Sequence, residues 1–289
     1  MKTSKYFSLH LGVLLLTFMV SGDFGPIPVS APTTSAAAWQ YDPCVNSNST
    51  FQHTEKLTYK IYYNWNFVWI AAGEVTFQVF EEGKQYHYQA RGHTYDSYEW
   101  FFTVNDEYDS WIDKNTLLPN YSERSVNEGK YHIFEKIAFN QGARKMTVYR
   151  ADKRGASETK TEHAVSGCVN DVLSSMYNLR NVDFAAQQAG FTLPFKVFMD
   201  KEEFPLRMRY RGKERKKVYN MGRYNTLKFQ PDVIAGNVFK EGEGMAVWVS
   251  DDQNRIPLLI ESPVSVGSVK MVLKDYWGLK YDFTAKVAK

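Results

Sequence analysis

The sequence of 289 residues lacks the short motifs that mark the common enzyme families. It contains no Gly-x-Ser-x-Gly sequence, no phosphate-binding glycine loop, no His-Glu-x-x-His and no dinucleotide-binding glycine pattern. These motifs supply a nucleophile, a phosphate cradle, a zinc site or a cofactor pocket. Their absence lowers the expectation of an enzyme, and we predict no cofactor and no catalytic residues.

A large excess of charge of one sign is also missing. The 35 basic and 32 acidic residues give a formal net charge of +3 at pH 7. Removal of residues 1–22, with Lys2 and Lys5, would leave about +1. A chain so close to neutrality has no overall field that attracts nucleic acid, so we expect no nucleic-acid partner.

Long hydrophobic runs are absent after the N-terminus. Lys2 and Lys5 precede an apolar stretch from Leu11 to Val20, which ends in Ser21 and Gly22. This stretch is too short to span a bilayer, and its order is typical of a secretory signal peptide. We predict a signal peptide over residues 1–22, with Ser35–Ala38 as a second place for processing. The remaining chain is expected to be exported, without a transmembrane segment.

Cysteine is scarce, since the chain has only Cys44 and Cys168. Without neighbouring histidines they lack the paired spacing of a zinc site, and we predict no metal. An even pair in an oxidising compartment favours one disulfide. Two separate buried thiols are the alternative.

Aromatic residues, in contrast, are abundant: 19 Tyr, 19 Phe and 7 Trp. They suit pleated strands, and short runs of period two recur along the chain between turn residues. We predict an all-β fold, a mostly antiparallel curved sheet of half-barrel or barrel-like form. Residues 23–50 form a Pro/Ser/Ala-rich arm, and residues 51–289 a single domain. The predicted strands are Leu57–Tyr63, Glu74–Phe80, Tyr86–Gly92, Glu107–Asp113, Tyr131–Phe139, Lys145–Arg150, Phe195–Asp200, Leu206–Arg211, Arg215–Tyr219, Thr226–Gln230, Met245–Ser250, Ile256–Glu261 and Val269–Tyr276.

One segment has helical periodicity. Asn170 is a suitable N-cap, and Arg180 stands in the last turn. We predict one main helix over residues 171–180, packed on the concave side of the sheet. Its apolar stripe consists of Val172, Leu173, Met176, Tyr177 and Leu179.

The sharpest charged feature is a basic segment from Leu206 to Lys217. Apolar and arginine residues alternate as far as Arg211, and we predict a hairpin turn at Arg211-Gly212. One interpretation is an outward face whose charges protect a sheet edge from other chains. The other is a site for an anionic envelope ligand, because arginine forks match phosphate and carboxylate. The candidate residues are Arg207, Arg209, Arg211, Lys213 and Arg215.

Two aromatic segments, Trp65–Ile70 and Tyr95–Phe102, are the second candidate site. Trp65, Trp69 and Trp100 are the residues that would stack on a sugar ring or line an acyl-chain cavity. The competing interpretation is core packing, since large aromatics dominate β cores.

The acidic residues and histidines give weaker signals. Carboxylates near the segment Tyr95–Trp111 raise the alternative of a glycan-active enzyme, which needs two carboxyl groups facing across a cleft. Asp251, Asp252 and Asn254 lack the ligand spacing of a twelve-residue calcium loop and its final glutamate. We predict a turn there. His87 and His93 are expected to be structural.

Several fragments together resemble one family of exported bacterial proteins, the domain of unknown function 3108 (DUF3108). The resemblance covers residues 51–275 and implies an exported, mostly antiparallel β protein of a Gram-negative envelope, with no assigned activity. The fragments are Glu55–Tyr59, Ala72–Glu74, Asp171–Leu173, Tyr177–Arg180, Arg211–Glu214, Gly236–Phe239, Met245–Asp252, Arg255–Pro257 and Val266–Val269.

The leading hypothesis is a non-enzymatic periplasmic or surface-associated protein that binds a lipid or an anionic envelope component, such as an acidic glycan. The alternatives are a glycan-active enzyme and a structural partner of an envelope complex. The shape of the sheet separates them: an apolar cavity favours lipid, and an open cleft with facing carboxylates favours glycan chemistry.

Overall fold

The computed structural model describes residues 42–65, 68–99, 102–184, 187–231, 244–263 and 267–288. The predicted signal peptide, most of the predicted arm, Trp100 and the fragment Gly236–Phe239 lie outside these residues.

Fourteen antiparallel strands form one continuous sheet in the described residues. The order is β8-β7-β6-β5-β4-β3-β2-β1-β14-β13-β12-β11-β10-β9, so the chain makes two meanders that meet where β1 pairs with β14. The predicted antiparallel β fold is therefore confirmed. The strands are β1 (Lys56–Trp65), β2 (Val68–Glu82), β3 (Gln85–Thr94), β4 (Asn105–Asp113), β5 (Pro119–Glu128), β6 (Tyr131–Asn140), β7 (Lys145–Ala151), β8 (Thr159–Ala164), β9 (Thr192–Met199), β10 (Glu202–Val218), β11 (Gly222–Pro231), β12 (Ala246–Ser250), β13 (Pro257–Pro263) and β14 (Ser268–Trp277).

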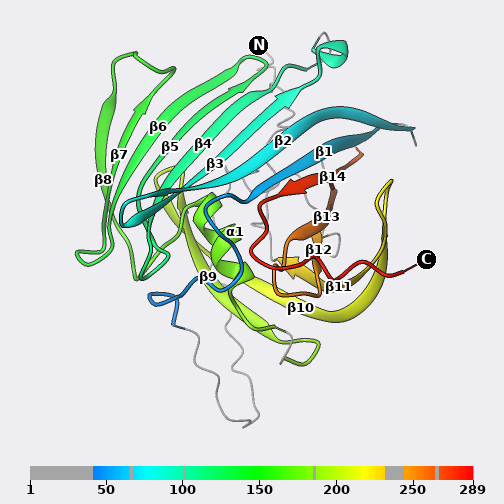
Figure 1. Ribbon diagram of the computed structural model, residues 1–289. Coiled ribbons are helices and arrows are strands. Elements are labelled where there is room, and N and C mark those ends of the chain that lie inside the picture. Colours follow the sequence, from blue (N-terminus) through cyan, green and yellow to red (C-terminus); the bar gives the residue numbers. More distant parts are fainter. Residues whose placement is uncertain are drawn as a thin grey trace.

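The sheet curls around helix α1 (Val172–Arg180), which lies in its concavity (Figure 1). Alternation in β1 makes one face of the strand apolar: Tyr59, Ile61 and Tyr63 are buried, while the residues between them are more exposed. Their face packs on the helix through one large apolar cluster that includes Leu173 and Tyr177. The predicted helix is confirmed, together with its place on the concave side.

The helix begins with a capping box. The side chain of Asp171 accepts a hydrogen bond from Ser174 N, and the side chain of Ser174 accepts one from Asp171 N. The N-cap is thus Asp171 and not Asn170 as predicted. Asn170 instead forms a parallel bridge with Val197 of β9, and its side chain accepts a hydrogen bond from Asn178.

The sheet does not close, because β8 and β9 are its two outer strands. Ionic contacts link the two meanders near these strands. Asp200, in the turn after β9, lies 2.5 Å from Arg124 of β5 and 2.8 Å from Arg150 of β7. Phe198 of β9 packs in an apolar cluster with residues of β6 and β7. The structure is therefore an incomplete barrel whose gap is bridged by side chains.

A disulfide joins Cys44 to Cys168, with a Cα–Cα distance of 5.3 Å. The predicted pairing is confirmed. It ties the end of the predicted arm to the segment before α1, across 124 residues of sequence. The two separate thiols of the alternative are excluded.

Two strands, β5 and β8, were not predicted, and one predicted turn is wrong. The exposed strand β8 has no apolar alternation, and the residues of β5 are mostly half-buried, so neither has a clear pattern of period two. Strand β10 runs through Gly212 without turning. A β-bulge interrupts its pairing with β11 between Tyr210 and Gly212, and Gly212 has φ +100° there. The hairpin turns at Tyr219–Met221 instead.

Candidate functional site

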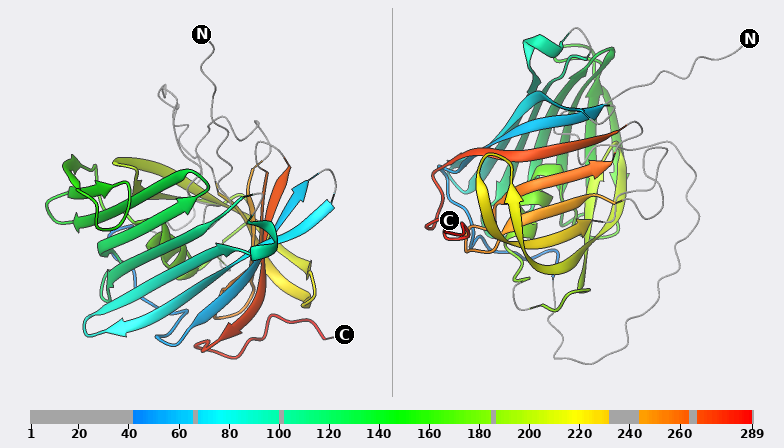
Figure 2. Two further views of the ribbon diagram at one scale, coloured as in Figure 1. Left: turned by 90° about the horizontal axis from the view of Figure 1, so that it is seen from above. Right: turned by 90° about the vertical axis from the view of Figure 1, so that its right-hand side faces the viewer.

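The long β10–β11 hairpin extends past its neighbours and folds back over the outer face of the sheet. Tyr219 in its turn contacts Tyr62 of β1, with ring centroids 5.8 Å apart. The right-hand view of Figure 2 shows the yellow hairpin in front of the orange and red strands β12 to β14. Beyond the bulge, the hairpin thus has one side against the sheet and one side toward solvent.

The sheet-facing side holds a buried tryptophan among lysines. Trp248 of β12 is 4% exposed and donates a hydrogen bond from Nε1 to Glu214. The ammonium of Lys216 lies 3.5 Å from the centroid of the Trp248 ring, and that of Lys228 lies 5.2 Å from it. Burial lowers the pKa of Lys216, against the opposing effect of Glu261 and Glu214. These cation–π contacts hold the hairpin onto the outer face.

The solvent-facing side carries three exposed cations. Lys217 lies directly opposite Arg223, and Arg215 lies opposite Asn225 in the same antiparallel register. Residues two apart on a strand share a face, so Arg215, Lys217 and Arg223 form one surface, which we call the basic tip. Within the described part of the chain, none of the three makes an ion pair.

The other predicted basic residues are divided by the bulge. Before it, Arg207 and Arg209 lie on the face opposite Leu206, Met208 and Tyr210, as predicted. Arg211 is the bulge residue and donates hydrogen bonds to Gln230 at 3.0 and 2.6 Å. Beyond the bulge, Lys213 lies on the other face of β10 from Arg207 and Arg209, because it pairs with the core residue Leu227. Its ammonium lies 3.0 Å from the Asp251 carboxylate. The candidates therefore do not form a single ladder.

Of the three predicted tryptophans, the described residues include the side chain of Trp69 alone. Trp69 lies near the start of β2, 39% exposed, with the Lys270 ammonium 4.1 Å from its ring centroid. Trp65 ends β1, but its side chain is outside the described part, as is all of Trp100. Trp69 belongs to the outer face of the sheet, on the side where the β10–β11 hairpin lies.

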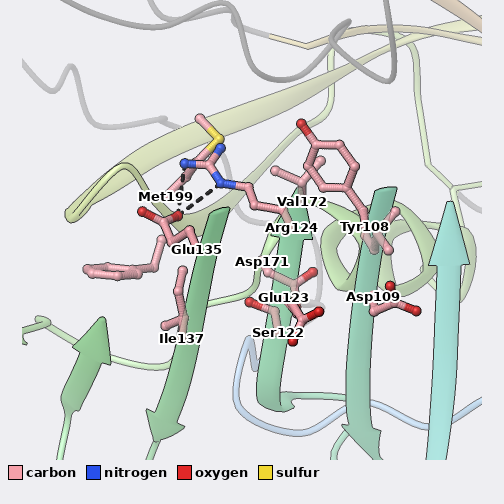
Figure 3. Close-up of a pocket in the computed structure, with 12 residues that line it drawn as sticks. Tyr108, Asp109, Ser122, Glu123, Arg124, Glu135, Ile137, Asp171, Val172 and Met199 are labelled. Atoms are coloured by element: carbon pink, nitrogen blue, oxygen red, sulfur yellow. Dashed lines mark hydrogen bonds and ion pairs between the residues drawn. The ribbon is translucent and has the colours of Figure 1, made fainter. Parts of the chain in front are cut away.

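A polar cavity of about 30 Å³ lies between α1, β4 to β6 and β9 (Figure 3). Arg124 of β5 and Glu135 of β6 meet in it at 2.8 Å, next to Tyr108, Ser122 and Asp171. A polar space of this volume holds a water molecule or two. An acyl chain needs several hundred Å³, so this cavity is not the predicted lipid site.

The carboxylates of β4 point to opposite faces of the sheet. Asp106 is buried on the concave side, and its carboxyl group lies close to that of Glu128 of β5. Burial raises the pKa of Glu128 to about 8, so at neutral pH it is mostly protonated. Two carboxyl groups in contact do not have the separation that glycosidases need.

Asp109, on the outer face, belongs to a saturated ionic cluster. Its two oxygens accept hydrogen bonds from Arg91 Nη2, at 2.9 and 2.7 Å, and Oδ1 lies 2.8 Å from His87 Nε2. His87 Nδ1 lies 2.9 Å from Glu82, and the ring stacks on Trp111 at 4.4 Å. Both ring nitrogens are engaged, so His87 has no nitrogen left for proton transfer. Despite desolvation, hydrogen bonds from His87 and Arg91 lower the pKa of Asp109.

The acidic turn between β12 and β13 is also occupied internally. Asp252 accepts hydrogen bonds from Asn254 N, Arg255 N and Ser250 Oγ through one oxygen, and from Ala285 N through the other. Its side chain thus organises the turn, as the sequence predicted. No group of three potential metal ligands is found among the described residues.

Sequence reasoning missed part of the basic tip. Arg223 is isolated in the sequence, and its position opposite Lys217 depends on where the hairpin turns. The sequence did contain a turn signal there, because Asn220 and Gly222 flank Met221 and both residue types tolerate positive φ. In the structure their φ values are 59° and 113°. Turn residues at that place compete with Arg211-Gly212 as the predicted turn.

The described residues include no helix that has both the length and the apolar character needed to cross a membrane. A family model described as "Protein of unknown function (DUF3108)" matches residues 58–274. No curated protein matches the chain.

Among solved structures, the chain is similar to a protein of Brucella abortus described as a beta-barrel-like protein of domain of unknown function DUF1849. The TM-score is 0.52 at 9% sequence identity, and the match covers 81% of this chain and 100% of that one. At this identity the likeness concerns the fold alone.

Proposed function

Because this chain belongs to the DUF3108 family, which brings no assigned activity, we propose from its own surface that it is an exported, non-enzymatic protein that binds an anionic component of the cell envelope. The proposed contact is the basic tip, Arg215, Lys217 and Arg223. The remaining candidates add to the positive charge of the same hairpin without being part of this surface: Arg207, Arg209, Arg211 and Lys213. The shared ligand chemistry is a row of phosphate or carboxylate groups.

The observation that carries this proposal is the pairing of Lys217 with Arg223. Like charges directly opposite on neighbouring strands destabilise a sheet. Here a third cation, Arg215, lies on the same exposed face, and no acidic side chain of the described residues pairs with it. An anion bound across the three would remove this repulsion.

The charge of the hairpin supports the same conclusion. Between Glu202 and Pro231 there are nine basic and three acidic residues, which gives +6, twice the +3 of the entire chain. The positive charge of the protein is thus concentrated on one element. A local basic surface on a nearly neutral chain is suited to recognition of an anionic partner.

Export is supported by the disulfide, which persists in oxidising compartments. Residues 1–22 have the sequence pattern of a signal peptide but lie outside the described residues.

The test is equilibrium binding of two soluble polyanions, polyphosphate and polygalacturonate, to purified protein at several salt concentrations. The triple variant R215Q/K217Q/R223Q is expected to bind about tenfold more weakly, with a shallower dependence of affinity on salt, since fewer counterions are released. Its melting temperature should stay within a few degrees of the wild type, since exposed substitutions each change stability by less than about 0.5 kcal/mol.

The matched control is K84Q/K130Q/K153Q, which removes three exposed lysines from turns on the β1–β8 side of the sheet. It lowers the net charge equally and should bind nearly as well as the wild type. Equal losses in both variants would show a nonspecific charge effect, and no binding by the wild type would refute the proposal.

A further inference from the structure

We propose that the anionic groups are lipid headgroups, and that the protein docks on an anionic bilayer surface with the side of the sheet that carries the β10–β11 turn. This inference rests on the proposed function and specifies its partner. The docking surface combines the basic tip with the aromatic residues Tyr62, Trp69 and Tyr219.

These aromatic residues are brought together from two hairpins. Tyr219 stands in the β10–β11 turn and contacts Tyr62 of β1 edge to face, with centroids 5.8 Å apart. Lys270 of β14 lies opposite Tyr62 in the sheet register, and its ammonium lies 4.1 Å from the Trp69 ring centroid. Tyr62, Trp69 and Tyr219 are therefore neighbours on the outer face, linked through Lys270.

Two of these three aromatic side chains, Trp69 and Tyr219, are exposed, whereas Tyr62 is half-buried. Six large hydrophobic residues of the described part are exposed, and three of them lie at these two hairpins: Val68 at 61%, Trp69 at 39% and Tyr219 at 61%. Val68, at the start of β2, points to the other face of the sheet, so Trp69 and Tyr219 are the exposed members of the docking surface. A local group of exposed apolar side chains marks an interaction surface.

The cations and the aromatic residues stand side by side. Lys217 is two residues before Tyr219, Arg223 lies opposite Lys217, and Lys270 covers Trp69. Tryptophan and tyrosine are the side chains that prefer the boundary between headgroups and acyl chains, and lysine and arginine are attracted to anionic lipids. A soluble polyanion would satisfy the cations but offers nothing apolar to Trp69 and Tyr219. A bilayer surface satisfies both, which decides between the two partners.

The experiment is co-sedimentation of purified protein with vesicles of phosphatidylcholine containing 30 to 40 mol% phosphatidylglycerol (roughly the anionic content needed for a strong surface potential). Vesicles of phosphatidylcholine alone serve as the neutral comparison. The variant W69S/Y219S is expected to lose about tenfold in affinity for the anionic vesicles and to keep its binding to soluble polyphosphate. The control variant V45S/W277S removes two apolar residues that are even more exposed, at 65% and 75%, and that lie outside the docking surface; it should bind like the wild type.

Each outcome decides one claim. Loss of vesicle binding in W69S/Y219S with polyphosphate binding retained supports the inference. Vesicle binding by W69S/Y219S equal to that of the wild type, or binding of polyphosphate but not vesicles by the wild type, overturns the inference and leaves the proposed function intact. Polyphosphate and vesicle binding that is unchanged in R215Q/K217Q/R223Q refutes the proposed function itself.

Discussion

Arg180, in the last turn of α1, forms a bidentate ion pair with Glu55 just before β1, at 2.6 and 2.8 Å. Both side chains are almost completely buried, and Arg180 also donates to the carbonyl oxygen of Asn254, in the turn between β12 and β13. Despite desolvation, the pairing with Glu55 raises the pKa of Arg180 above its usual value. One guanidinium thus joins three segments that are 125 and 74 residues apart in the sequence.

Loss of Glu55 should therefore be costly. In Glu55→Gln, the guanidinium stays buried without its counterion, and we expect a loss of about 3–5 kcal/mol in the free energy of unfolding. Urea denaturation measures it. The exposed pair Lys145–Glu162 is the control, and Glu162→Gln should leave the free energy of unfolding nearly unchanged. Similar small effects of both substitutions would contradict the assigned role of Glu55.

The packing of α1 is tested by Leu173→Ala. Leu173 is 2% exposed in the main apolar cluster, so removing its side chain should cost about 2–5 kcal/mol. Met176 lies on the same helix but is only partly buried, and Met176→Ala should cost less. A loss below roughly half a kcal/mol for Leu173→Ala would mean that the helix does not fill the concavity.

Two buried tyrosines should respond differently to loss of the hydroxyl. Tyr59 donates a hydrogen bond to Pro257 O at 2.9 Å, whereas the Tyr177 hydroxyl has no partner among the described residues. Tyr59→Phe should therefore cost about 1–2 kcal/mol, while Tyr177→Phe should be neutral or stabilising. Thermal unfolding of the two variants under identical conditions compares them. The reverse order would be evidence against this difference.

Glu128 should make the protein less stable as pH rises. Below pH 4.5 the residue is protonated in both states, but between about 4.5 and about 8 the folded state keeps a proton that the unfolded state has released. The contribution of this group is thus complete below pH 4.5 and is lost as pH rises through about 8.

Glu128→Gln removes this dependence. The variant should be more stable than the wild type above pH 8, by roughly 2–4 kcal/mol, and similar to it at pH 4. Urea denaturation at pH 4, 6 and 9 tests the sign. Stability curves of the same slope for both proteins would show that Glu128 is not protonated in the folded state.

Most of the local structure of this protein could be predicted from its sequence. Alternation of period two marks most strands, the apolar stripe from Val172 to Leu179 marks the helix, and the scarcity of cysteine left Cys44 and Cys168 a single pairing. These signals depend on residues close together in the chain or on the number of cysteines, so they can be recognised without knowledge of the fold. The family resemblance also came from the sequence, and the family match over residues 58–274 confirms it.

The contacts between side chains far apart in the sequence depend on the tertiary fold. The pairing of Lys217 with Arg223 required the hairpin to turn at Tyr219–Met221, and the bulge at Arg211 reversed the faces of the residues after it. A shift of one residue exchanges the two faces of a strand, and the sequence does not specify where a bulge falls. Glu55 and Arg180, and likewise Trp69 and Lys270, come together because the sheet curls and its two meanders join at β1 and β14. Burial of the whole core selects that arrangement of the two meanders, and no local sequence pattern specifies it.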